Sequence, residues 1–470
     1  MSEPETGRGT GSESARGAAA DGPHLAGSSR LLRAINETAA LGHLLERGPL
    51  TRGDLRTLTG LAKPTTSEVL RRLQEAGLAK VVGRTSGGPG RNADVYAVNP
   101  DAAYAAAISV REHDHTLAVA ICDLTGQRRA QIEVALGAHP NARPDAEPNA
   151  RPGAHPMTDT QPGTHPVQAV ADAVKAACEQ ARVPRRRLHH VQLAVPGSYD
   201  ERTGVIRYVD VPGWSRPGLT DEIRAKLRTP VSVDNDVNLA ATAERRHGTA
   251  AGHDSFALLW LGEEGLGLAI DLGGVLLRGA RGGAGEIGYM PVGLPGHGGK
   301  PSAGGKPPGS KPPAGGEPPA GNLPQADGAP QGVHDFQDLV GGEAVRDLAR
   351  QYGFLADTGQ DATRAAVSAL TSDDPAKAQA FLDALAVRIA VGLAAVVAVL
   401  DPSLVVLAGE VGQAGGEPLQ QAVRAALEDM SVLETSVATT GVTQDAVLTG
   451  ALDASLTEVR NALLGRRSDS

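Results

Sequence analysis

Apolar residues recur along this chain with two periods, and each period predicts one kind of element. Runs that are apolar throughout, or that alternate with polar residues, predict β-strands at residues 106–110, 116–124 and 131–136. Apolar residues at helical spacing predict helices at Val167–Ala181 and Leu219–Leu227. Because strands and helices alternate in this part of the chain, we expect an α/β architecture.

The pattern continues toward the C-terminus. Residues 189–195 and 403–409 predict buried strands, and residues 255–262 with 265–277 predict a β-hairpin. The longest apolar run, residues 389–400, is shorter than the ~20 residues that a membrane-spanning helix needs. We therefore expect a buried helix there and no membrane partner.

A compact unit with its own pattern precedes these strands. Thr51 is placed to cap a helix, with Asp54 three residues later as a weaker form of the capping box, and Gly60 follows in a tight turn. A second helix is predicted from Lys63, with Ala62 where a capping Ser would be expected. The apolar residues on the inward face of this helix are Val69, Leu70 and Leu73.

Two strands and a Gly-rich turn follow the second helix, which predicts a winged helix-turn-helix. The strands are residues 78–84 and 94–98, and the turn contains the sequence GPGR. From Arg30 to Val98 there are eleven Arg and Lys residues against six Asp and Glu residues, in a chain whose net charge is −9. A basic unit in an acidic chain indicates a double-stranded DNA partner. The alternative is a small helical unit that binds protein.

The residues that we predict to contact DNA lie on the second helix and along the wing. A recognition helix places its N-terminal half in the major groove. An Arg at the tip of a wing suits a narrow minor groove, where negative potential is concentrated. The predicted DNA-binding residues are Lys63, Thr65, Thr66, Ser67, Arg71, Arg84 and Arg91.

Composition adds three expectations. Gly and Pro gather at residues 137–166 and 294–332, which predicts two solvated inserts; the first contains scattered His residues, but a loop is favoured there over a metal site. Residues 1–28 predict a disordered tail without the apolar segment of a secretory signal. Cys122 and Cys178 form no metal or redox motif, which excludes a disulfide scaffold and fits a cytoplasmic protein.

The clearest candidate for chemistry is VSVDNDVNLAATA, residues 231–243. It places two carboxylates and two carboxamides where a predicted strand ends and a helix begins. Such a cluster suits a catalytic base, a clamp that binds a polyol, or a solvated turn. These residues alone leave the three alternatives open.

Five segments together resemble the ROK family, which unites repressors, uncharacterised reading frames and sugar kinases. They are AVPGSYDERTGVIRY, the Gly213–Trp214 pair, PVSVDNDVNLAATAE, RGARGGAGEIGYMPV and DPSLVVLAGEV. The resemblance implies an N-terminal winged helix-turn-helix, mostly α, and a two-lobed α/β body of the actin-like (ribonuclease H-like) type with its ligand in the cleft. The implied domains are a tail at 1–28, a DNA-binding domain at 29–100 and the ROK body at 101–465.

Kinase members of this family hold phosphate with two Gly-rich loops, and this chain departs from both. In the first loop, Arg111 stands at the position of an Asp, and His113 and Asp114 stand at those of two glycines. The second loop carries Glu263 and Glu264. Glycines let backbone N–H groups approach phosphate, whereas carboxylates repel it. We therefore expect no ATP cofactor and no enzyme activity. The zinc cysteines of the family are also missing, so no metal is expected.

The sugar-binding part of the family pattern survives in part. The matching ligand-binding residues are Asn235, Asp236, Glu286 and Tyr289, and Asp236 matches the catalytic base of the kinases. Tyr289 replaces a zinc-binding His, and Gln337 stands where a further Glu is expected. If their segment is helical, Glu286 and Tyr289 share one face, and both can bond sugar hydroxyls. A ligand clamp is favoured over a vestigial clamp and over a working base.

These observations together predict a cytoplasmic transcriptional regulator, most simply a repressor. It would bind a palindromic operator as a homodimer or higher homo-oligomer and respond to a sugar or sugar derivative in a kinase-like cleft. One alternative is a carbohydrate kinase that carries a DNA-binding arm. Another is a regulator that works without an effector and keeps only a vestigial cleft.

Overall fold

The computed structural model divides into two compact units. One unit comprises residues 1–99 together with 461–470, and the other comprises Pro100–Arg460. The described residues are 24–86, 92–112, 114–136, 166–209, 211–263, 265–293, 333–355 and 361–464. Both predicted inserts lie outside them, except that Pro166 is the first residue of a helix.

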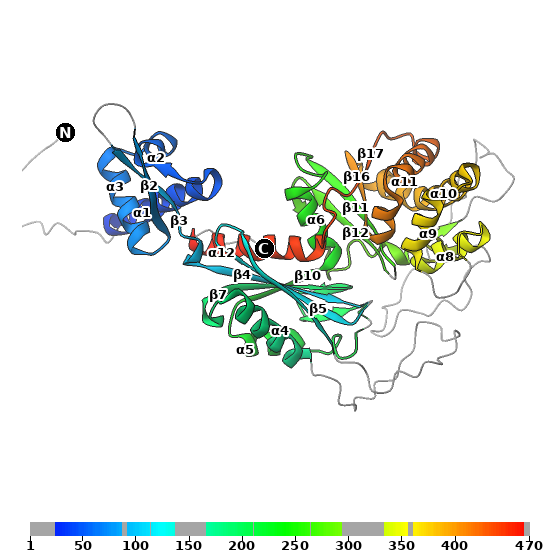
Figure 1. The fold of residues 1–470 in the computed structure, drawn as a ribbon, viewed down its shortest axis with the longest axis horizontal. Helices are drawn as coiled ribbons and strands as arrows, with labels where there is room; N and C mark the ends of the chain where they lie inside the picture. The colour runs from blue at the N-terminus through cyan, green and yellow to red at the C-terminus, as the bar shows by residue number, and fades with distance from the viewer. Residues whose placement is uncertain are drawn as a thin grey trace, which may run out of the picture. The chain divides into compact units, whose positions relative to one another are not determined.

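The described residues of the N-terminal unit form three helices and a three-stranded sheet (Figure 1). The elements are α1 (His24–Arg47), β1 (Leu50–Thr51), α2 (Arg52–Thr59), α3 (Lys63–Glu75), β2 (Ala79–Ser86) and β3 (Asn92–Val98). The strands pair antiparallel in the order β1-β3-β2. Helix α1 begins at His24, inside the stretch 1–28 that was expected to be a disordered tail.

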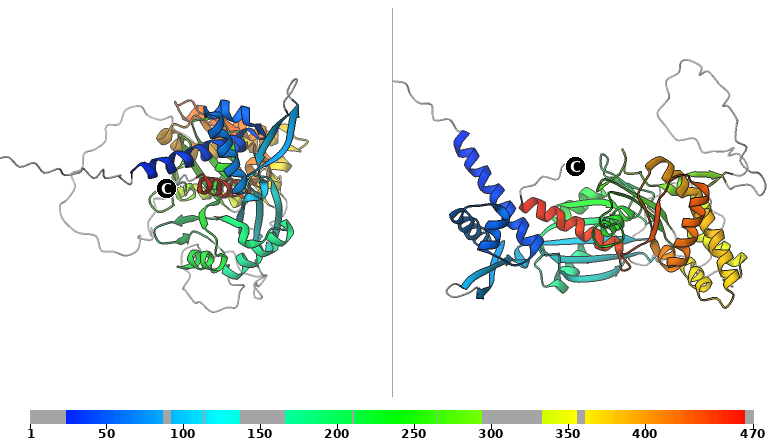
Figure 2. Two further views of the ribbon diagram at one scale, coloured as in Figure 1. Left: turned by 90° about the vertical axis from the view of Figure 1, so that its left-hand side faces the viewer. Right: turned by 90° about the horizontal axis from the view of Figure 1, so that it is seen from above.

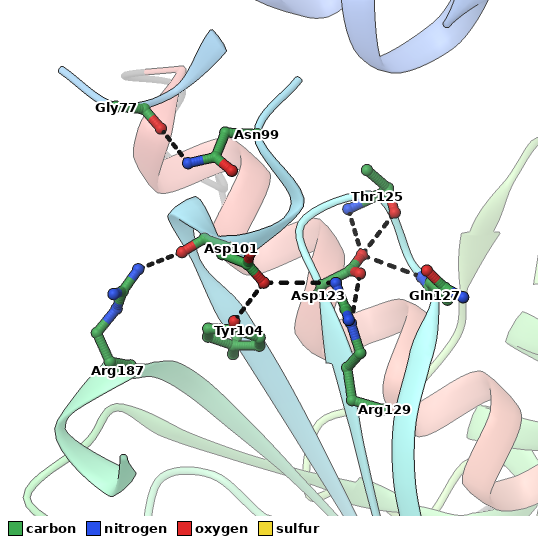
Figure 3. A network of polar contacts seen from close by, with 9 residues as sticks. All are labelled: Gly77, Asn99, Asp101, Tyr104, Asp123, Thr125, Gln127, Arg129 and Arg187. Carbon is green, nitrogen blue, oxygen red and sulfur yellow. Dashed lines mark hydrogen bonds and ion pairs between the residues drawn. The ribbon is translucent and has the colours of Figure 1, made fainter. Parts of the chain in front are cut away.

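The helices of this unit enclose a small core. Leu41, Leu44, Leu55 and Leu70 are almost fully buried between them. The three apolar residues predicted to face inward from α3 are all buried: Val69, Leu70 and Leu73. At the end of the unit, the Asn99 side-chain nitrogen donates a hydrogen bond of 2.9 Å to the carbonyl of Gly77 (Figure 3).

The larger unit has two lobes, each built around a five-stranded sheet (Figures 1 and 2). The first lobe begins with a short 3-10 turn at Pro100–Ala102. Its elements are β4 (Tyr104–Arg111), β5 (Thr116–Asp123), β6 (Arg128–Ala135), α4 (Pro166–Ala181), η2 (Arg185–Arg187), β7 (Leu188–Val195), β8 (Ser198–Asp200), β9 (Val205–Arg207), α5 (Leu219–Leu227), β10 (Val231–Asn235) and most of α12 (Ala446–Leu463).

The first sheet has the order β10-β7-β4-β5-β6. Strands β4, β5 and β6 pair antiparallel, whereas β7 and β10 extend the sheet parallel to β4. Helices α4 and α5 cover one face with apolar residues such as Val170, Val174 and Ile223. Helix α12 runs along the opposite face, where Ser455 bonds to His190 of β7 (Figure 1).

The second lobe holds most of the remaining helices. Its elements are α6 (Asp236–His247), β11 (Ser255–Leu261), β12 (Leu266–Leu272), β13 (Val275–Leu276), η3 (Ile287–Tyr289), β14 (Pro291–Gly293), β15 (Val333–Asp335), α7 (Phe336–Val340), α8 (Gly342–Gln351), α9 (Ala362–Leu370), α10 (Pro375–Leu400), β16 (Leu404–Ala408), α11 (Gly409–Met430) and β17 (Ser436–Thr439).

The second sheet repeats the plan of the first. Its order is β13-β12-β11-β16-β17, with β11, β12 and β13 antiparallel and β16 and β17 added in parallel. Helix α6 covers one face through Val237 and Ala241. Residues of α7–α11 pack against the other face in the largest apolar core. Two lobes with the same strand plan confirm the expected actin-like, ribonuclease H-like body.

Helix α10 differs in length from the expectation. It extends over 26 residues, so among the described residues it is the one helix long and apolar enough to cross a membrane by length and composition. Half of its most apolar stretch is buried within the protein. Phe381, Leu385, Ile389 and Leu393 lie in the second lobe's core, which agrees with the predicted buried helix.

A buried carboxylate fixes the turn between β5 and β6 in the first sheet (Figure 3). Asp123 is fully buried at the end of β5 and accepts hydrogen bonds from the backbone N–H groups of Thr125 and Gln127. Arg129 forms an ion pair with Asp123 at 2.7 Å and reaches Asp101 at 3.4 Å. Every group in this cluster is used by a turn or a neighbouring strand, which indicates a structural role.

Candidate DNA-binding helix and ligand cleft

Local interactions define the two helices of the DNA-binding unit. The Thr51 hydroxyl accepts from the N–H of Asp54 at 3.2 Å, and the Asp54 carboxylate accepts from the N–H of Thr51 at 2.9 Å, so the predicted capping box is present. Gly60 ends α2 with φ of 69°, a conformation that favours glycine. Ala62 makes no side-chain cap to α3, as expected. These contacts give a helix-turn-helix.

The polar residues of α3 do not all face solvent. Lys63 is exposed, while Thr65 and Ser67 are partly exposed. Thr66 is only 1% exposed, and its hydroxyl donates to the carbonyl of Ala62 at 3.1 Å. The prediction that Thr66 contacts DNA is therefore wrong, because its side chain lies on the core side of the helix.

Arg71 is exposed and paired with two acids on its own helix. Its guanidinium donates to Glu68 at 2.6 and 2.9 Å and also bonds to Glu75. Hydrogen bonds from Arg71 and Arg72 lower the pKa of Glu68 to about 2. Glu68, which the sequence analysis did not consider, thus holds Arg71 in a defined position. To contact DNA, Arg71 would replace its ion pairs with Glu68 and Glu75 by contacts to the DNA. The replacement costs little, because exposed ion pairs are individually weak.

The wing presents Arg84 on β2. Arg84 lies opposite Asp94 of β3 and donates to its carboxylate at 2.9 Å, with 70% of the Arg84 side chain exposed. Arg91 lies outside the described residues.

In the body, the end of β10 and the start of α6 bring the clamp residues together. Asn235 caps α6: its side-chain oxygen accepts from the N–H of Asn238 at 3.0 Å, and its nitrogen donates to the carbonyl of Gly197 at 2.9 Å. Asp236 is the first residue of α6, and one carboxylate oxygen accepts from the N–H of Val237 at 2.7 Å. Asn235 therefore positions the helix start that presents Asp236.

Four carboxylates lie close enough to influence one another at this point. Burial, followed by the charges of Glu112, Glu286 and Glu410, raises the pKa of Asp236 to about 7. Burial also raises the pKa of Glu286. Glu112 follows β4 in the first lobe, and Glu410 begins α11 after β16 in the second. Acids from both lobes therefore gather around Asp236, and the place where they gather is called the recess below.

Sequence reasoning missed Glu112 and Glu410. Each follows the carboxyl end of a strand within its sheet, and ligands bind at such strand ends in open α/β sheets. Their positions after two apolar strands were the signal that could have found them.

Tyr289 lies at the margin of the recess. Glu286 precedes the 3-10 turn that ends at Tyr289, so the segment is a single tight turn. Tyr289 is 60% exposed, and its ring contacts that of Tyr208 with centroids 5.3 Å apart. Partial desolvation and the charge of Glu286 raise the pKa of the Tyr289 phenol.

An ion pair joins the two lobes next to the clamp residues Asn235 and Asp236. Arg278, just after β13, donates to one carboxylate oxygen of the buried Asp234 at 2.7 and 3.0 Å. The other oxygen of Asp234 accepts from the N–H of Asn235 and the side chain of Asn238. Asp234 is thus a structural acid, in contrast to Asp236, which the family resemblance assigns to the ligand.

Comparison with known proteins decides the family. The model described as the ROK family matches residues 155–457, which is more than half of the chain. The chain belongs to the ROK family. A second model, of the MarR family, matches residues 33–91 of this ROK protein, a range that includes α2, α3 and β2 of the winged helix-turn-helix.

Individual relatives of this ROK protein include both regulators and kinases. It is similar to the xylose repressor of Bacillus subtilis (strain 168), at 22% identity over 56% of this chain and 62% of that protein. It is also similar to the glucokinase of Halalkalibacterium halodurans, at 34% identity over 26% of this chain and 37% of that enzyme. The chain therefore spans about a third to two thirds of the length of these curated relatives.

The fold is shared with a solved regulator of the same family. A ROK family transcriptional regulator, described as a homologue of the E. coli MLC protein, superposes with a TM-score of 0.61 and 17% identity, over 92% of this chain and 98% of that one. The expected architecture, a winged helix-turn-helix followed by a ROK body, is confirmed.

In this ROK protein, Arg111 stands in the segment that corresponds to the first phosphate loop of the kinases, and it pairs with two acids. Its guanidinium bonds to Glu133 and to Asp445, each at 2.9 Å. Asp114 accepts from the hydroxyl of Thr116 at 2.7 Å. His113 lies outside the described residues.

The second loop corrects one expectation. Glu263 was expected to add negative charge where phosphate would bind, but its carboxylate accepts from the N–H groups of Ala362 and Thr363 at 2.6 Å each. Glu263 therefore caps the N-terminus of α9, a position that favours an anion. Glu264 lies outside the described residues.

Gln337 stands in the region where the family resemblance implies a zinc site and a further Glu. Gln337 lies beside the Glu286 segment, since a Cβ on Gly288 would be 3.3 Å from the Gln337 side-chain oxygen. Within the described residues no cluster of three His, Cys, Asp or Glu side chains has the arrangement of a metal site.

Proposed function

We propose that this ROK protein is a DNA-binding transcriptional repressor whose operator affinity is controlled by a sugar or sugar derivative in the interlobe recess. The observation that carries the proposal is a winged helix-turn-helix on a ROK body whose first phosphate loop holds an ion-paired Arg111. The similarity to the xylose repressor supports the same class of function.

The DNA contact is assigned to five accessible residues of α3 and β2, which are Lys63, Thr65, Ser67, Arg71 and Arg84. Arg91, which lies outside the described residues, is assigned from the sequence. A winged helix-turn-helix of this size reads one half-site, so we infer a homodimer, or a higher homo-oligomer, on a palindromic operator. The proposed regulator works in the cytoplasm, where its DNA partner lies.

The effector contact is assigned to the recess between the lobes. Asp236 and Glu286 provide the acceptors for sugar hydroxyls, Tyr289 provides an edge contact, and Asn235 positions Asp236. Carboxylates in partly dry surroundings make stronger hydrogen bonds than neutral acceptors.

A sugar kinase is the second candidate, and one observation favours it. Asp236 has a pKa near the working pH, which suits a general base. The Arg111 network opposes this candidate, because an arginine that is paired with Glu133 and Asp445 stands where the first phosphate loop of the kinases has an Asp. A coupled assay with ATP and a panel of monosaccharides should stay at background, and turnover that Asp236→Asn abolishes would contradict the repressor assignment.

Selection of binding sites from random double-stranded DNA tests the regulator directly. We expect an enriched palindrome, and Arg71→Ala should weaken binding to it by ~1–3 kcal/mol while relaxing base preference. Arg424→Ala is a matched control, because Arg424 is another exposed arginine paired with a Glu four residues away, on α11. Enrichment of no sequence, or equal effects of both variants, would count against the assignment.

A further inference from the structure

Two exposed tyrosines meet at the edge of the recess, one from each lobe. Tyr208 follows β9 in the first lobe, and Tyr289 ends η3 in the second. Their ring centroids are 5.3 Å apart with the planes inclined by 44°, which lies within the range of attractive aromatic pairs. The exposed fractions are 58% for Tyr208 and 60% for Tyr289. Each ring therefore keeps a large part of its surface open to a ligand.

The backbone holds Tyr208 in this outward position at a cost. Its φ of 59° lies in the left-handed region, which residues other than Gly, Asn and Asp adopt rarely. The strand before it also packs closely against Gly197, where a Cβ would lie 2.1 Å from the carbonyl of Arg207 and 2.7 Å from that of Tyr208. Strain that the surroundings maintain is typical of ligand-binding positions. Aromatic residues are only 3% of this chain, so an exposed pair is unusual here.

The pair of Tyr208 and Tyr289 lies next to the acids around Asp236 and is more exposed than Asp236. The charges of Glu112 and Glu286 act on both the Tyr289 phenol and the Asp236 carboxyl, so all four groups are neighbours. Asp236 is partly buried, whereas both tyrosines are exposed. Because Asp236 is less accessible than the two tyrosines, we assign the acids to the inner part of the proposed site and the tyrosines to its outer rim. A monosaccharide held by Asp236 and Glu286 would leave the rim uncovered.

We propose that Tyr208 and Tyr289 form an outer subsite that stacks against the second ring of a glycoside, whose first sugar is held by Asp236 and Glu286. The proposal rests on the proposed sugar site and narrows its ligand to a disaccharide or an aryl glycoside. Both ligand types present a flat apolar face, and tyrosine offers such faces at low entropic cost. Because the tyrosines come from different lobes, the second ring would also hold the lobes together.

Titration calorimetry with paired probes tests the outer subsite. The probes are glucose with cellobiose, maltose and phenyl glucoside, and xylose with xylobiose and phenyl xyloside. For at least one sugar, we expect a glycoside to bind the wild-type protein about tenfold more tightly than its parent monosaccharide, from one or two stacking contacts. Tyr208→Ala and Tyr289→Ala should each reduce that ratio severalfold. Tyr208→Phe, which keeps the ring, should retain it.

The outcomes separate this inference from the proposed function. Equal affinity for a monosaccharide and all of its glycosides, or a ratio that Tyr208→Ala and Tyr289→Ala leave intact, overturns the outer subsite and leaves the sugar-responsive regulator standing. Failure of every sugar and glycoside to bind overturns both. A ratio that falls equally in Tyr208→Phe assigns the contact to the hydroxyl and overturns stacking.

Discussion

Replacing Asp236 with Asn should stabilise this protein at neutral and alkaline pH. The wild-type carboxyl is surrounded by protein and by Glu112, Glu286 and Glu410, and these raise its pKa from an ordinary 3.8 to about 7. A carboxyl whose pKa is higher in the folded state makes its full contribution to the free energy of unfolding below its unfolded pKa of 3.8. That contribution is lost as the pH rises from there through 7. Asn keeps an oxygen that can accept from the N–H of Val237 but never ionises.

The size of the effect follows from the pKa. Each tenfold change in acid strength is worth ~1.4 kcal/mol, so the ionised Asp236 costs the fold up to ~4 kcal/mol at pH 8. At pH 5 the same calculation gives a cost of ~2 kcal/mol. The side chain keeps some contact with solvent, so these are upper values. We expect the stability advantage of Asp236→Asn to grow by ~2 kcal/mol from pH 5 to pH 8.

Urea unfolding between pH 5 and 8 measures this advantage. The two tryptophans, Trp214 and Trp260, both lie in the body, so their fluorescence reports on the unit that contains Asp236. Asp221→Asn serves as the control, because Asp221 is a highly exposed acid at the start of α5. An advantage that stays constant with pH, or one that grows toward acid, would refute the buried, charge-crowded environment of Asp236.

Three further outcomes are expected. Burial between the hydroxyls of Ser232 and Ser455 lowers the pKa of His190 to about 4. The neutral imidazole therefore contributes its full stability above pH 6.5, and this stability is lost as the pH falls. The wild-type protein should lose ~2 kcal/mol of unfolding free energy through His190 between pH 7.5 and 5, and urea unfolding of His190→Gln should lack this loss. Arg278→Ala leaves the buried Asp234 without its ion-pair partner and should destabilise the body by ~2–4 kcal/mol, whereas Arg278→Lys should recover part of this. Arg71→Ala should make DNA binding less selective without changing the unfolding of the body, because Arg71 lies in the other unit; loss of body stability in that variant would contradict this division.

Elements with a strong local pattern could be predicted from the sequence. The helix at Leu219–Leu227 was predicted with the bounds that the structure has, because its apolar spacing and its flanks are local. The capping box of Thr51 and Asp54 is likewise a matter of three neighbouring residues. The clamp acids Asp236 and Glu286 were recognised through a family resemblance, and the structure places them near each other.

Contacts between distant segments could not be predicted in this way. Glu263 bonds to the start of α9, about 100 residues later, and no local pattern distinguishes that role from one beside phosphate. Glu112 and Glu410 approach Asp236 only because the two lobes face each other. Thr66 was assigned to the DNA face, but the rotation of α3 on its core turns it inward. Each of these outcomes depends on packing between elements.

Operator release as a function of saccharide concentration tests the central claim most directly. The measurement uses fluorescence anisotropy of the selected DNA with the wild-type protein and Asp236→Ala. The repressor assignment predicts that a saccharide releases the wild-type protein, that Asp236→Ala binds the same DNA with unchanged affinity, and that its release requires about ten- to a hundredfold more saccharide. Equal responses of the two proteins, or release of neither by any saccharide, would contradict a sugar-controlled repressor with Asp236 in its sensor.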